Sequence, residues 1–147
     1  MKNLLLIAAL FFLSFSYASE GDWGKTGHRA TGEVAEGYLS KKAKQEINDL
    51  LNGQSLAFIS TYADDIKSDP RYRKYGPWHY VNLEPGETEY TKEKANPAGD
   101  LVQGIKTSIA VLKDPKASKE EKAFYLKMLV HFMGDLHQPM HTGRGED

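Results

Sequence analysis

The segment from Met128 to His141, MLVHFMGDLHQPMH, places three histidines and one aspartate among apolar residues. Imidazoles and carboxylates that converge can bind a metal ion, and zinc takes its nitrogen and oxygen ligands from these side chains. His131 and Asp135 are about 40° apart around a helix axis, so both project from one face. The pair can share one cation, or it can be a hydrogen-bonded pair of the core without further function.

The other two histidines of the segment differ in position. Pro139 ends the helix and turns the chain, so His141 can return toward Asp135 as a second imidazole. His137 lies about 240° around the helix from His131 and points elsewhere. We expect His137 to lie on the surface or to contact a metal ligand without binding the metal itself.

Two further histidines stand outside this segment. His28 ends the motif WGKTGH, and His79 lies in PWHYVN after a turn-prone stretch. Taken singly, His28 can be an ordinary helical residue, and His79 can belong to an aromatic cluster with Trp78 and Tyr80. The set of histidines, rather than any one of them, indicates a metal site.

Capping signals and apolar spacing predict the helices that must position these residues. The predicted helices cover residues 26–40, 41–51, 55–66, 98–112 and 122–138. Ser40 is expected to cap the second helix, Asn96 with Pro97 the fourth, and Ser118 with Glu121 the last. Residues 67–77 are predicted to be turns, and residues 78–87 an extended stretch or loop. The last helix is apolar on nearly every side, and we expect it to be buried all round.

Composition limits the class of protein. The chain has 147 residues, of which 40% are hydrophobic, and this is the size of one domain with an adequate core. The 19 basic and 20 acidic residues give a net charge of -1, so any anionic substrate must be held by local charges. No alternating strand pairs are evident, and we expect an all-α domain. Without cysteine, it must be held by its core or by metal.

The first residues are typical of an export signal. Lys2 precedes an apolar run from Leu4 to Phe15, and Ser16-Tyr17-Ala18 forms a small-x-small cleavage site. The run is shorter than the roughly 20 apolar residues that span a membrane. We expect residues 1–22 to be a signal peptide cleaved after residue 18 with a short leader, and a secreted or periplasmic protein without a membrane anchor.

Five motifs, in order, resemble those of the zinc-dependent single-strand-specific nucleases of the S1/P1 type, a family that includes mung bean nuclease. They are WGKTGH, YADD, WHYVN, VHFMGD and LHQPMH. The resemblance begins at Trp23 and runs to the last residue. It implies the helical domain shared by zinc phospholipase C and nuclease P1, with three zinc ions.

Carried over motif by motif, the resemblance also implies the metal ligands. The first zinc ion takes Asp64, His79, His131 and Asp135. The third takes Asp135 as a bridging ligand, His28, and the amino and carbonyl groups of Trp23, while the second takes His141. Helical spacing leaves Asp64 and Asp65 as alternatives, and only the family motif selects Asp64, so we expect Asp65 to be solvated.

Two departures from the family pattern concern the chain ends. The remaining ligands of the second zinc ion, a histidine and an aspartate in an NLH..WD-like motif, do not follow GRGED. Residues 23–147 therefore resemble the N-terminal portion of the family domain, incomplete at its C-terminus. Cleavage after residue 18 leaves Ser19 to Asp22 ahead of Trp23, so a free Trp23 amine requires further processing.

The resemblance further implies substrate contacts. Lys67 stands where the family has an arginine for the scissile phosphate, and it supplies charge without paired hydrogen bonds. Tyr80 matches an aromatic residue on which a nucleobase stacks, and Asn82 replaces a base-reading aspartate of some relatives. Asp64 is expected to orient or deprotonate the attacking water.

Together these features predict an exported, monomeric, zinc-dependent endonuclease and 3'-nucleotidase. Its substrates would be single-stranded DNA or RNA and 3'-nucleotides, and strand cleavage would release 5'-mononucleotides. One alternative is a phosphodiesterase similar to zinc phospholipase C. Another is a non-catalytic, metal-binding helical fragment.

Overall fold

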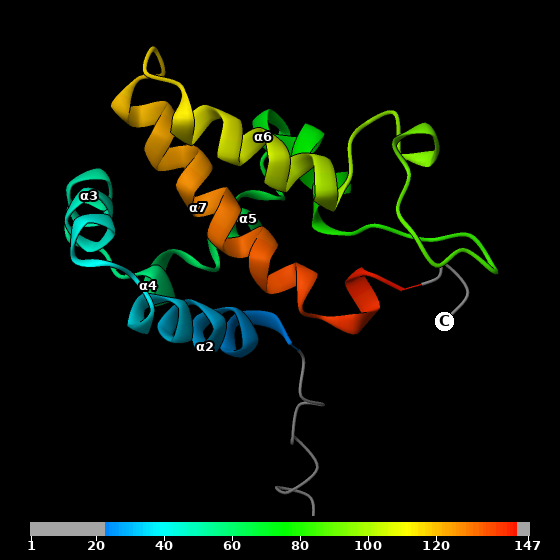
Figure 1. Cartoon of the computed structure of the whole chain (residues 1–147), viewed down its shortest axis with the longest axis horizontal. Helices are drawn as coiled ribbons and strands as arrows, with labels where there is room; N and C mark the ends of the chain where they lie inside the picture. Colours follow the sequence, from blue (N-terminus) through cyan, green and yellow to red (C-terminus); the bar gives the residue numbers. More distant parts are fainter. Residues whose placement is uncertain (1–22, 144–147) are drawn as a thin grey trace, which may run out of the picture.

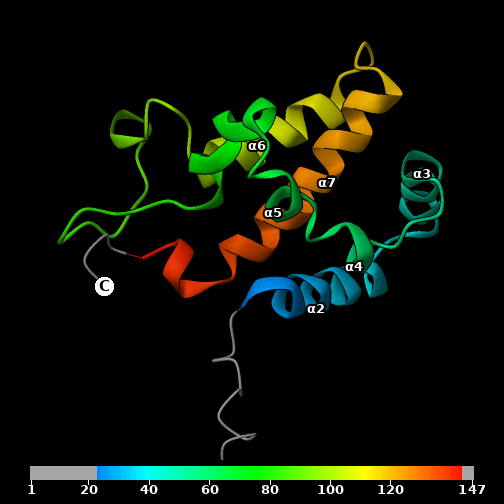
Figure 2. The ribbon, with the colours of Figure 1, turned by 180° about the vertical axis from the view of Figure 1, so that it is seen from behind.

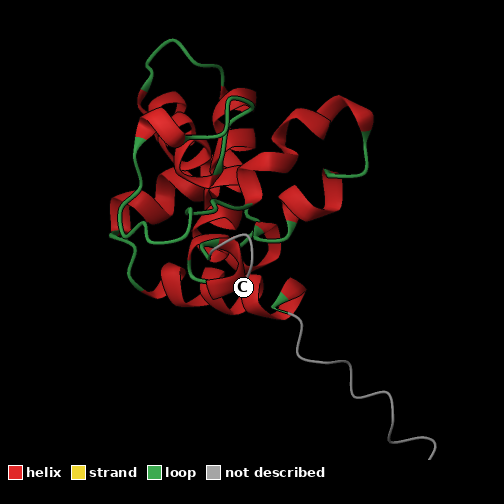
Figure 3. Cartoon of the chain, turned by 90° about the vertical axis from the view of Figure 1, so that its right-hand side faces the viewer, coloured by secondary structure: helices red, strands yellow, loops and turns green. Residues whose placement is uncertain are grey.

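The computed structural model describes residues 23–143, and all its regular elements are helical (Figure 3). They are α2 Gly24–Gly37, α3 Lys41–Leu51, α4 Leu56–Ile59, α5 Tyr62–Ile66, η1 Pro70–His79, η2 Lys92–Lys94, α6 Leu101–Lys113, α7 Lys119–Leu136 and η3 Pro139–His141. The all-α prediction is confirmed. Within residues 23–143, none of the helices combines the length and the hydrophobicity that a membrane span requires. The predicted signal peptide and leader, residues 1–22, lie outside the described residues.

Helix α7 is the element against which the others pack (Figures 1 and 2). Helix α6 runs alongside it, and α2 packs against it from the opposite side in Figure 1. Its further partners are α3, α4, α5, η1 and η3. Side chains from distant parts of the sequence can therefore meet on α7.

The described residues form two hydrophobic clusters along α7. The first contains Ala63, Tyr75, Leu101, Met128 and Phe132. The second contains Leu51, Leu56, Ile59 and Leu126. Phe132 of the first cluster directly follows His131, so the packed core adjoins the predicted metal site and holds α7 in place beside it.

Two predicted helix caps are confirmed. Ser40 Oγ accepts a hydrogen bond from Ala43 N at 3.1 Å, and α3 begins at the next residue. Ser118 and Glu121 form the predicted capping box of α7. Such caps satisfy amide groups that the first helical turn leaves without partners.

The predicted start of α6 is wrong. The side chain of Asn96 accepts a hydrogen bond from Ala98 N and forms a local turn. Gly99 has a φ of 93°, which a right-handed helix cannot include, so α6 begins only at Leu101. The cap is Asp100, whose side chain accepts from Gln103 N at 2.9 Å.

The helix predicted over residues 55–66 is divided. Helices α4 and α5 are separated at Ser60 and Thr61, whose hydroxyls donate to Ala57 O and Asp65 Oδ2 respectively. Such local bonds compete with a continuous helix. The predicted turns of residues 67–77 are largely replaced by the 3₁₀ helix η1, which also includes Trp78 and His79.

The expectation that α7 is buried all round is also wrong. Met133 and Leu136 are exposed, whereas His131, Phe132 and Asp135 are fully buried. The polar pair therefore lies on the inner face of the helix and two apolar residues lie on the outer one. Hydrophobicity alone does not identify the inner face here.

Two glycines of α2 provide a matched test of its packing. A Cβ at Gly32 would lie 2.8 Å from the backbone of Leu56, whereas a Cβ at Gly37 would meet no atom within 4 Å. We expect Gly32→Ala to lower the free energy of unfolding by about 1 to 3 kcal/mol. Gly37→Ala should leave it unchanged or raise it by up to about 1 kcal/mol, because alanine favours helix. Urea unfolding measures both, and equal effects would contradict the contact between α2 and α4.

Candidate metal centre

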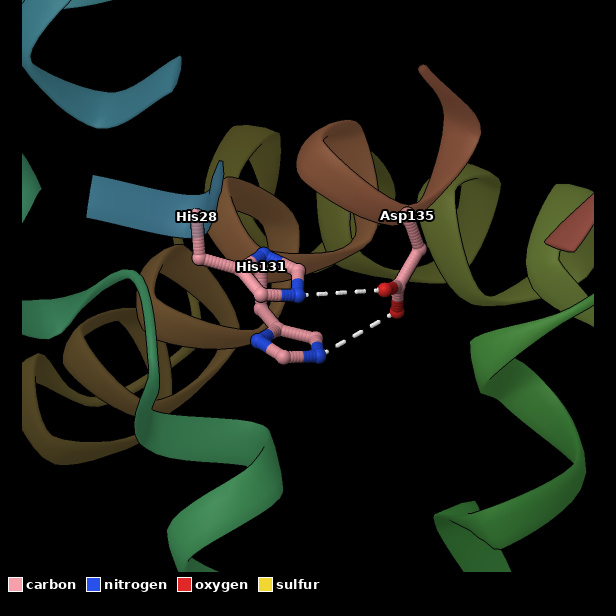
Figure 4. A group of neighbouring side chains, drawn as sticks. All are labelled: His28, His131 and Asp135. Carbon is pink, nitrogen blue, oxygen red and sulfur yellow. Dashed lines mark ion pairs between the residues drawn. The ribbon is translucent and has the colours of Figure 1, made fainter. Parts of the chain in front are cut away.

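The buried carboxylate of Asp135 faces four imidazoles, two at each oxygen. Oδ2 lies 3.1 Å from His79 Nδ1 and 3.2 Å from His131 Nε2. Oδ1 lies 3.3 Å from His28 Nε2 and 3.2 Å from His141 Nδ1. Figure 4 shows His28 and His131 directed at the two oxygens. The structure thus brings together residues from α2, η1, α7 and η3 around one carboxylate.

A hydrogen bond on the far side of its ring orients His131. Its Nδ1 lies 2.7 Å from the carbonyl oxygen of Ser60, which can only accept, so Nδ1 carries the proton. This bond turns Nε2, the other ring nitrogen, toward Asp135. Ser60 was not identified from the sequence, because no local pattern indicates a carbonyl that serves a side chain 71 residues away.

His28 reaches the centre because α2 and α7 approach closely at a glycine. Any Cβ at Gly134 would collide with Nδ1 of His28. The rings of His28 and His131 are stacked, with centroids 3.9 Å apart and planes 15° from parallel. Gly134 was also not singled out from the sequence, although a glycine inside an apolar helix is a recognisable signal of close packing.

Asp64 and His79 complete a second side of the centre. His79 Nδ1 lies 3.0 Å from His131 Nε2, and Asp64 Oδ1 lies 3.9 Å from each of these nitrogens. The ring of Phe132 stands perpendicular to that of His79, with centroids 5.7 Å apart. The packed core thus contacts His79 directly.

The spacing of these atoms fits a tetrahedral metal site. With zinc-ligand distances near 2.0 to 2.2 Å, the ligand atoms of a tetrahedron lie about 3.3 Å apart. The ring nitrogens of His79 and His131 and one oxygen of Asp135 are separated by 3.0 to 3.2 Å, and Asp64 stands slightly farther out at 3.9 Å. The four donors are of the types that zinc prefers.

Unpartnered buried atoms support the same conclusion. Within residues 23–143, His28 Nδ1 and Asp135 Oδ1 have no hydrogen-bond partner. Asp135 Oδ1 lies within ion-pair distance of His28 and His141, but neither contact has the alignment of a hydrogen bond. Because a buried carboxylate oxygen without a partner is costly, a cation between these groups would relieve the cost.

Both carboxylates of the centre are held ionised. Burial raises the pKa of Asp135, but the contacts of His131, His28 and His79 outweigh it and hold the pKa far below its usual range. Burial also raises the pKa of Asp64. The Lys67 hydrogen bond and the charges of His131 and Lys67 outweigh burial and hold the pKa below its usual value. Ionised carboxylates are the form that binds metal.

Three further predicted residues lie around this centre. Asp65 is exposed, accepts a hydrogen bond from Thr61 and pairs with Lys25, so it does not join the centre. The ring of His137 turns to the carbonyl of Met133 at 2.7 Å. Trp23 precedes α2 and its carbonyl oxygen accepts from Gly27 N, while the residues ahead of its amine lie outside the described part. The role of Trp23 as a ligand stays a prediction.

One of the three predicted substrate residues contacts the metal centre, and the other two line a separate pocket. Lys67 is exposed, and its Nζ lies 3.0 Å from Asp64 Oδ1. Tyr80, which is 42% exposed, directly follows His79. Tyr80 and Asn82 line one pocket of about 130 Å³, whose buried acidic residue is Asp100.

Comparison with known proteins identifies the family. Residues 23–147 match the sequence profile of the S1/P1 nucleases. The chain belongs to this family. It is 28% identical to Endonuclease 2 of Arabidopsis thaliana over 99% of its length, 28% identical to Nuclease P1 of Penicillium citrinum over 81%, and 27% identical to Nuclease S1 of Aspergillus oryzae over 96%.

The chain spans about half the length of these relatives: 55%, 47% and 50% respectively. Two groups in this S1/P1 nuclease domain offer ligand atoms close enough together to hold a metal ion. They are His28 with His131 and Asp135, and Asp64 with His79 and His131. The S1/P1 nucleases are metal-dependent, and these two groups could hold a metal ion in the described part of the chain.

Metal should stabilise the folded domain. A ligand that binds only the folded state adds about 2.7 kcal/mol at one hundred times its Kd, or roughly 10 °C in Tm for a domain of this size. We expect the zinc-loaded protein to lose about that much Tm when a chelator is added. Differential scanning calorimetry measures it. An unchanged Tm and unchanged helical circular dichroism would contradict a metal site at Asp135.

Asp135→Asn tests whether one carboxylate serves two ions. The amide has one good ligand oxygen in place of two and carries no charge, so both ions assigned to Asp135 should bind too weakly to be retained. Asp65→Asn is the matched control, because Asp65 is exposed and faces Lys25, and it should keep the parent content. Metal per chain is measured by mass spectrometry. Loss of one ion or none from Asp135→Asn would count against a shared ligand.

Proposed function

We propose that the protein containing this chain is an exported, zinc-dependent nuclease. It hydrolyses phosphodiester bonds of single-stranded DNA or RNA to 5'-mononucleotides and also acts on 3'-nucleotides. Membership of the S1/P1 family supports the reaction class. One observation supports the chemistry most strongly: the two oxygens of buried Asp135 each face a different pair of imidazoles.

Three zinc ions are part of the proposal. Asp64, His79, His131 and Asp135 would hold the first. Asp135 would also bind the third zinc ion, together with His28 and Trp23. His141 would be one ligand of the second zinc ion. When bound, the ions would activate water and polarise the phosphoryl oxygen. His141 Nδ1 donates a hydrogen bond to the carbonyl oxygen of His79 at 2.8 Å, which leaves the other ring nitrogen free to act as a ligand.

Asp64 is suited to accept a proton from the attacking water. It is ionised, only partly buried, and lies at the outer edge of the centre, where water can reach it. Lys67 lies on the solvent side of Asp64, so its ammonium group can hold a phosphate oxygen there. The ion pair with Asp64 restrains the lysine before substrate arrives, which lowers the entropy lost on binding.

Tyr80 and Asn82 are suited to hold the base. Tyr80, which directly follows His79, presents a partly exposed ring, and stacking on such a ring is insensitive to base identity. The amide of Asn82 supplies both a donor and an acceptor to the same pocket. Such a pocket favours a nucleotide over the headgroup that a phospholipase C-like enzyme would bind. A monomer is proposed, since one chain supplies all these contacts.

Export rests on the sequence of residues 1–18, with their basic start, apolar run and small-x-small site. The lack of cysteine is compatible with either a reducing or an oxidising compartment. Metal binding would then stabilise the exported domain in place of disulfides.

Two substitutions should separate binding from chemistry. Tyr80→Ala removes a contact made before and during reaction, so it should chiefly raise KM, by on the order of tenfold for a stacked base. Asp64→Ala removes a metal ligand and the group aimed at the attacking water, so kcat should collapse. Steady-state cleavage of single-stranded DNA by the zinc-loaded protein measures both effects. Tyr38→Ala, at a ring that is 88% exposed and lines no part of this pocket, is the control.

Three outcomes would contradict the proposal. Tyr80→Ala could lower kcat while KM stays unchanged, which would misplace the base. Asp64→Ala could turn over normally, which would misplace the metal. A protein that binds zinc fully but hydrolyses neither single-stranded nucleic acid nor 3'-nucleotides would favour the non-catalytic alternative.

A further inference from the structure

A groove of about 190 Å³ lies between α2, α4, α5 and α7, on the surface where Figure 2 shows α4 and α5. Its lining includes Lys25, Arg29 and Lys127, with Asp65 as the acidic residue. Three cations against one carboxylate give it two net positive charges. This local charge contrasts with the net charge of -1 of the whole chain. The groove therefore favours an anionic ligand that the protein as a whole does not attract.

Aromatic side chains accompany these cations. Phe58 lines the groove, is 61% exposed, and is absent from both hydrophobic clusters. Tyr62 also lines it, and the ammonium of Lys127 lies 4.7 Å from the centre of the Tyr62 ring. A single exposed apolar side chain needs no explanation. Together, however, an open aromatic ring and several cations have the composition of a groove for single-stranded nucleic acid.

Three lining residues of the groove lie close along their helices to residues of the metal centre. Lys127 precedes His131 by four residues on α7, which is about 6 Å along the helix axis. Lys25 precedes His28 by three residues on α2, and Asp65 follows Asp64 on α5. One lining residue on each of three helices is thus within about one turn of a residue of the centre.

The pocket of Tyr80 and Asn82 lies toward the other end of α7. Val81 N donates to the carbonyl of His141, which follows the C-terminus of this helix, at 2.8 Å. The groove instead adjoins Lys127, in the middle of the helix, on the N-terminal side of His131. Along α7, His131 therefore lies between the two surfaces.

We propose that this groove binds the third nucleotide of a single strand, beyond the dinucleotide that spans the scissile bond and on the side opposite Tyr80. Arg29 and Lys127 hold the phosphate, and Phe58 stacks on the base. The inference rests on the proposed nuclease function and extends it, because it assigns the protein a preference for chains longer than a dinucleotide. Arg29 is exposed and its guanidinium can contact two phosphate oxygens at once.

Binding to the zinc-loaded protein tests the groove. The probes are a fluorescein-labelled thymidine dinucleotide and an oligothymidylate of about twelve residues, both with phosphorothioate linkages that resist cleavage. Fluorescence anisotropy gives Kd at several salt concentrations. Phe58→Ala should raise Kd for the longer probe at least about fivefold, and Arg29→Gln should lower its salt slope by about 0.7. Neither substitution should change binding of the dinucleotide.

Matched controls come from the same chain. Tyr38→Ala and Arg73→Gln change an exposed aromatic and an exposed arginine that do not line the groove, and they should leave both probes unaffected. Circular dichroism confirms folding of each variant. Phe58 and Arg29 are exposed, so their substitution should leave the fold intact.

Two results would overturn the inference. In one, Phe58→Ala and Arg29→Gln bind the longer probe as tightly as the controls do. In the other, Arg29→Gln weakens single-stranded and double-stranded DNA equally while Phe58→Ala weakens neither, as for a general basic patch. The dinucleotide reports separately on the proposed function. A parent protein that neither binds the dinucleotide nor cleaves its phosphodiester form contradicts that function. Binding of the longer probe still tests whether the groove holds a nucleotide.

Discussion

The negative charge of Asp135 is the constraint on which the rest of the structure depends. Its side chain is fully buried, and an uncompensated charge in such a place costs several kcal/mol. Compensation comes from imidazoles on α2, η1, α7 and η3, so each of these elements must stay packed for the carboxylate to remain stable. The site and the helical packing thus stabilise each other. A metal ion would strengthen this coupling, since it would join the same elements with short bonds.

The groups around the metal centre orient its histidine side chains in addition to balancing the charge of Asp135. Ser60 turns one nitrogen of His131 inward by accepting a hydrogen bond from the other. Gly134 allows α2 to approach until His28 stacks on His131. Phe132 meets His79 edge to face and fills the space behind it. Neighbouring groups of this kind orient metal ligands and affect metal affinity strongly. By contrast, Asp64, Lys67 and Tyr80 face solvent, as residues that meet a substrate must.

Local sequence predicted the helices where the signal was local. The caps at Ser40 and Ser118 depend on residues within one turn, and both are confirmed. Helix α3 begins where predicted, whereas α7 begins at Lys119, directly after its cap and three residues before the predicted range. The start of α6 was misplaced because Gly99 adopts a conformation that no neighbouring pattern specifies. The break between α4 and α5 coincides with a contact between Ser60 and His131, which are distant in sequence.

In the metal centre, helical spacing could pair His131 with Asp135, but only the family motifs could add His28 and His79. Spacing could not separate Asp64 from Asp65, because the difference lies in which partners each carboxylate faces. The groove was not found because its residues are spread over four helices.

The central claim is that Asp135 bridges two metal ions, and anomalous diffraction at the zinc absorption edge tests it most directly. Crystals of the zinc-loaded protein should show two anomalous peaks, each within about 2.2 Å of a different oxygen of Asp135. One peak should lie among Asp64, His79 and His131, and the other beside His28. A map without peaks at Asp135, in which both oxygens accept hydrogen bonds from protonated imidazoles, would contradict the account.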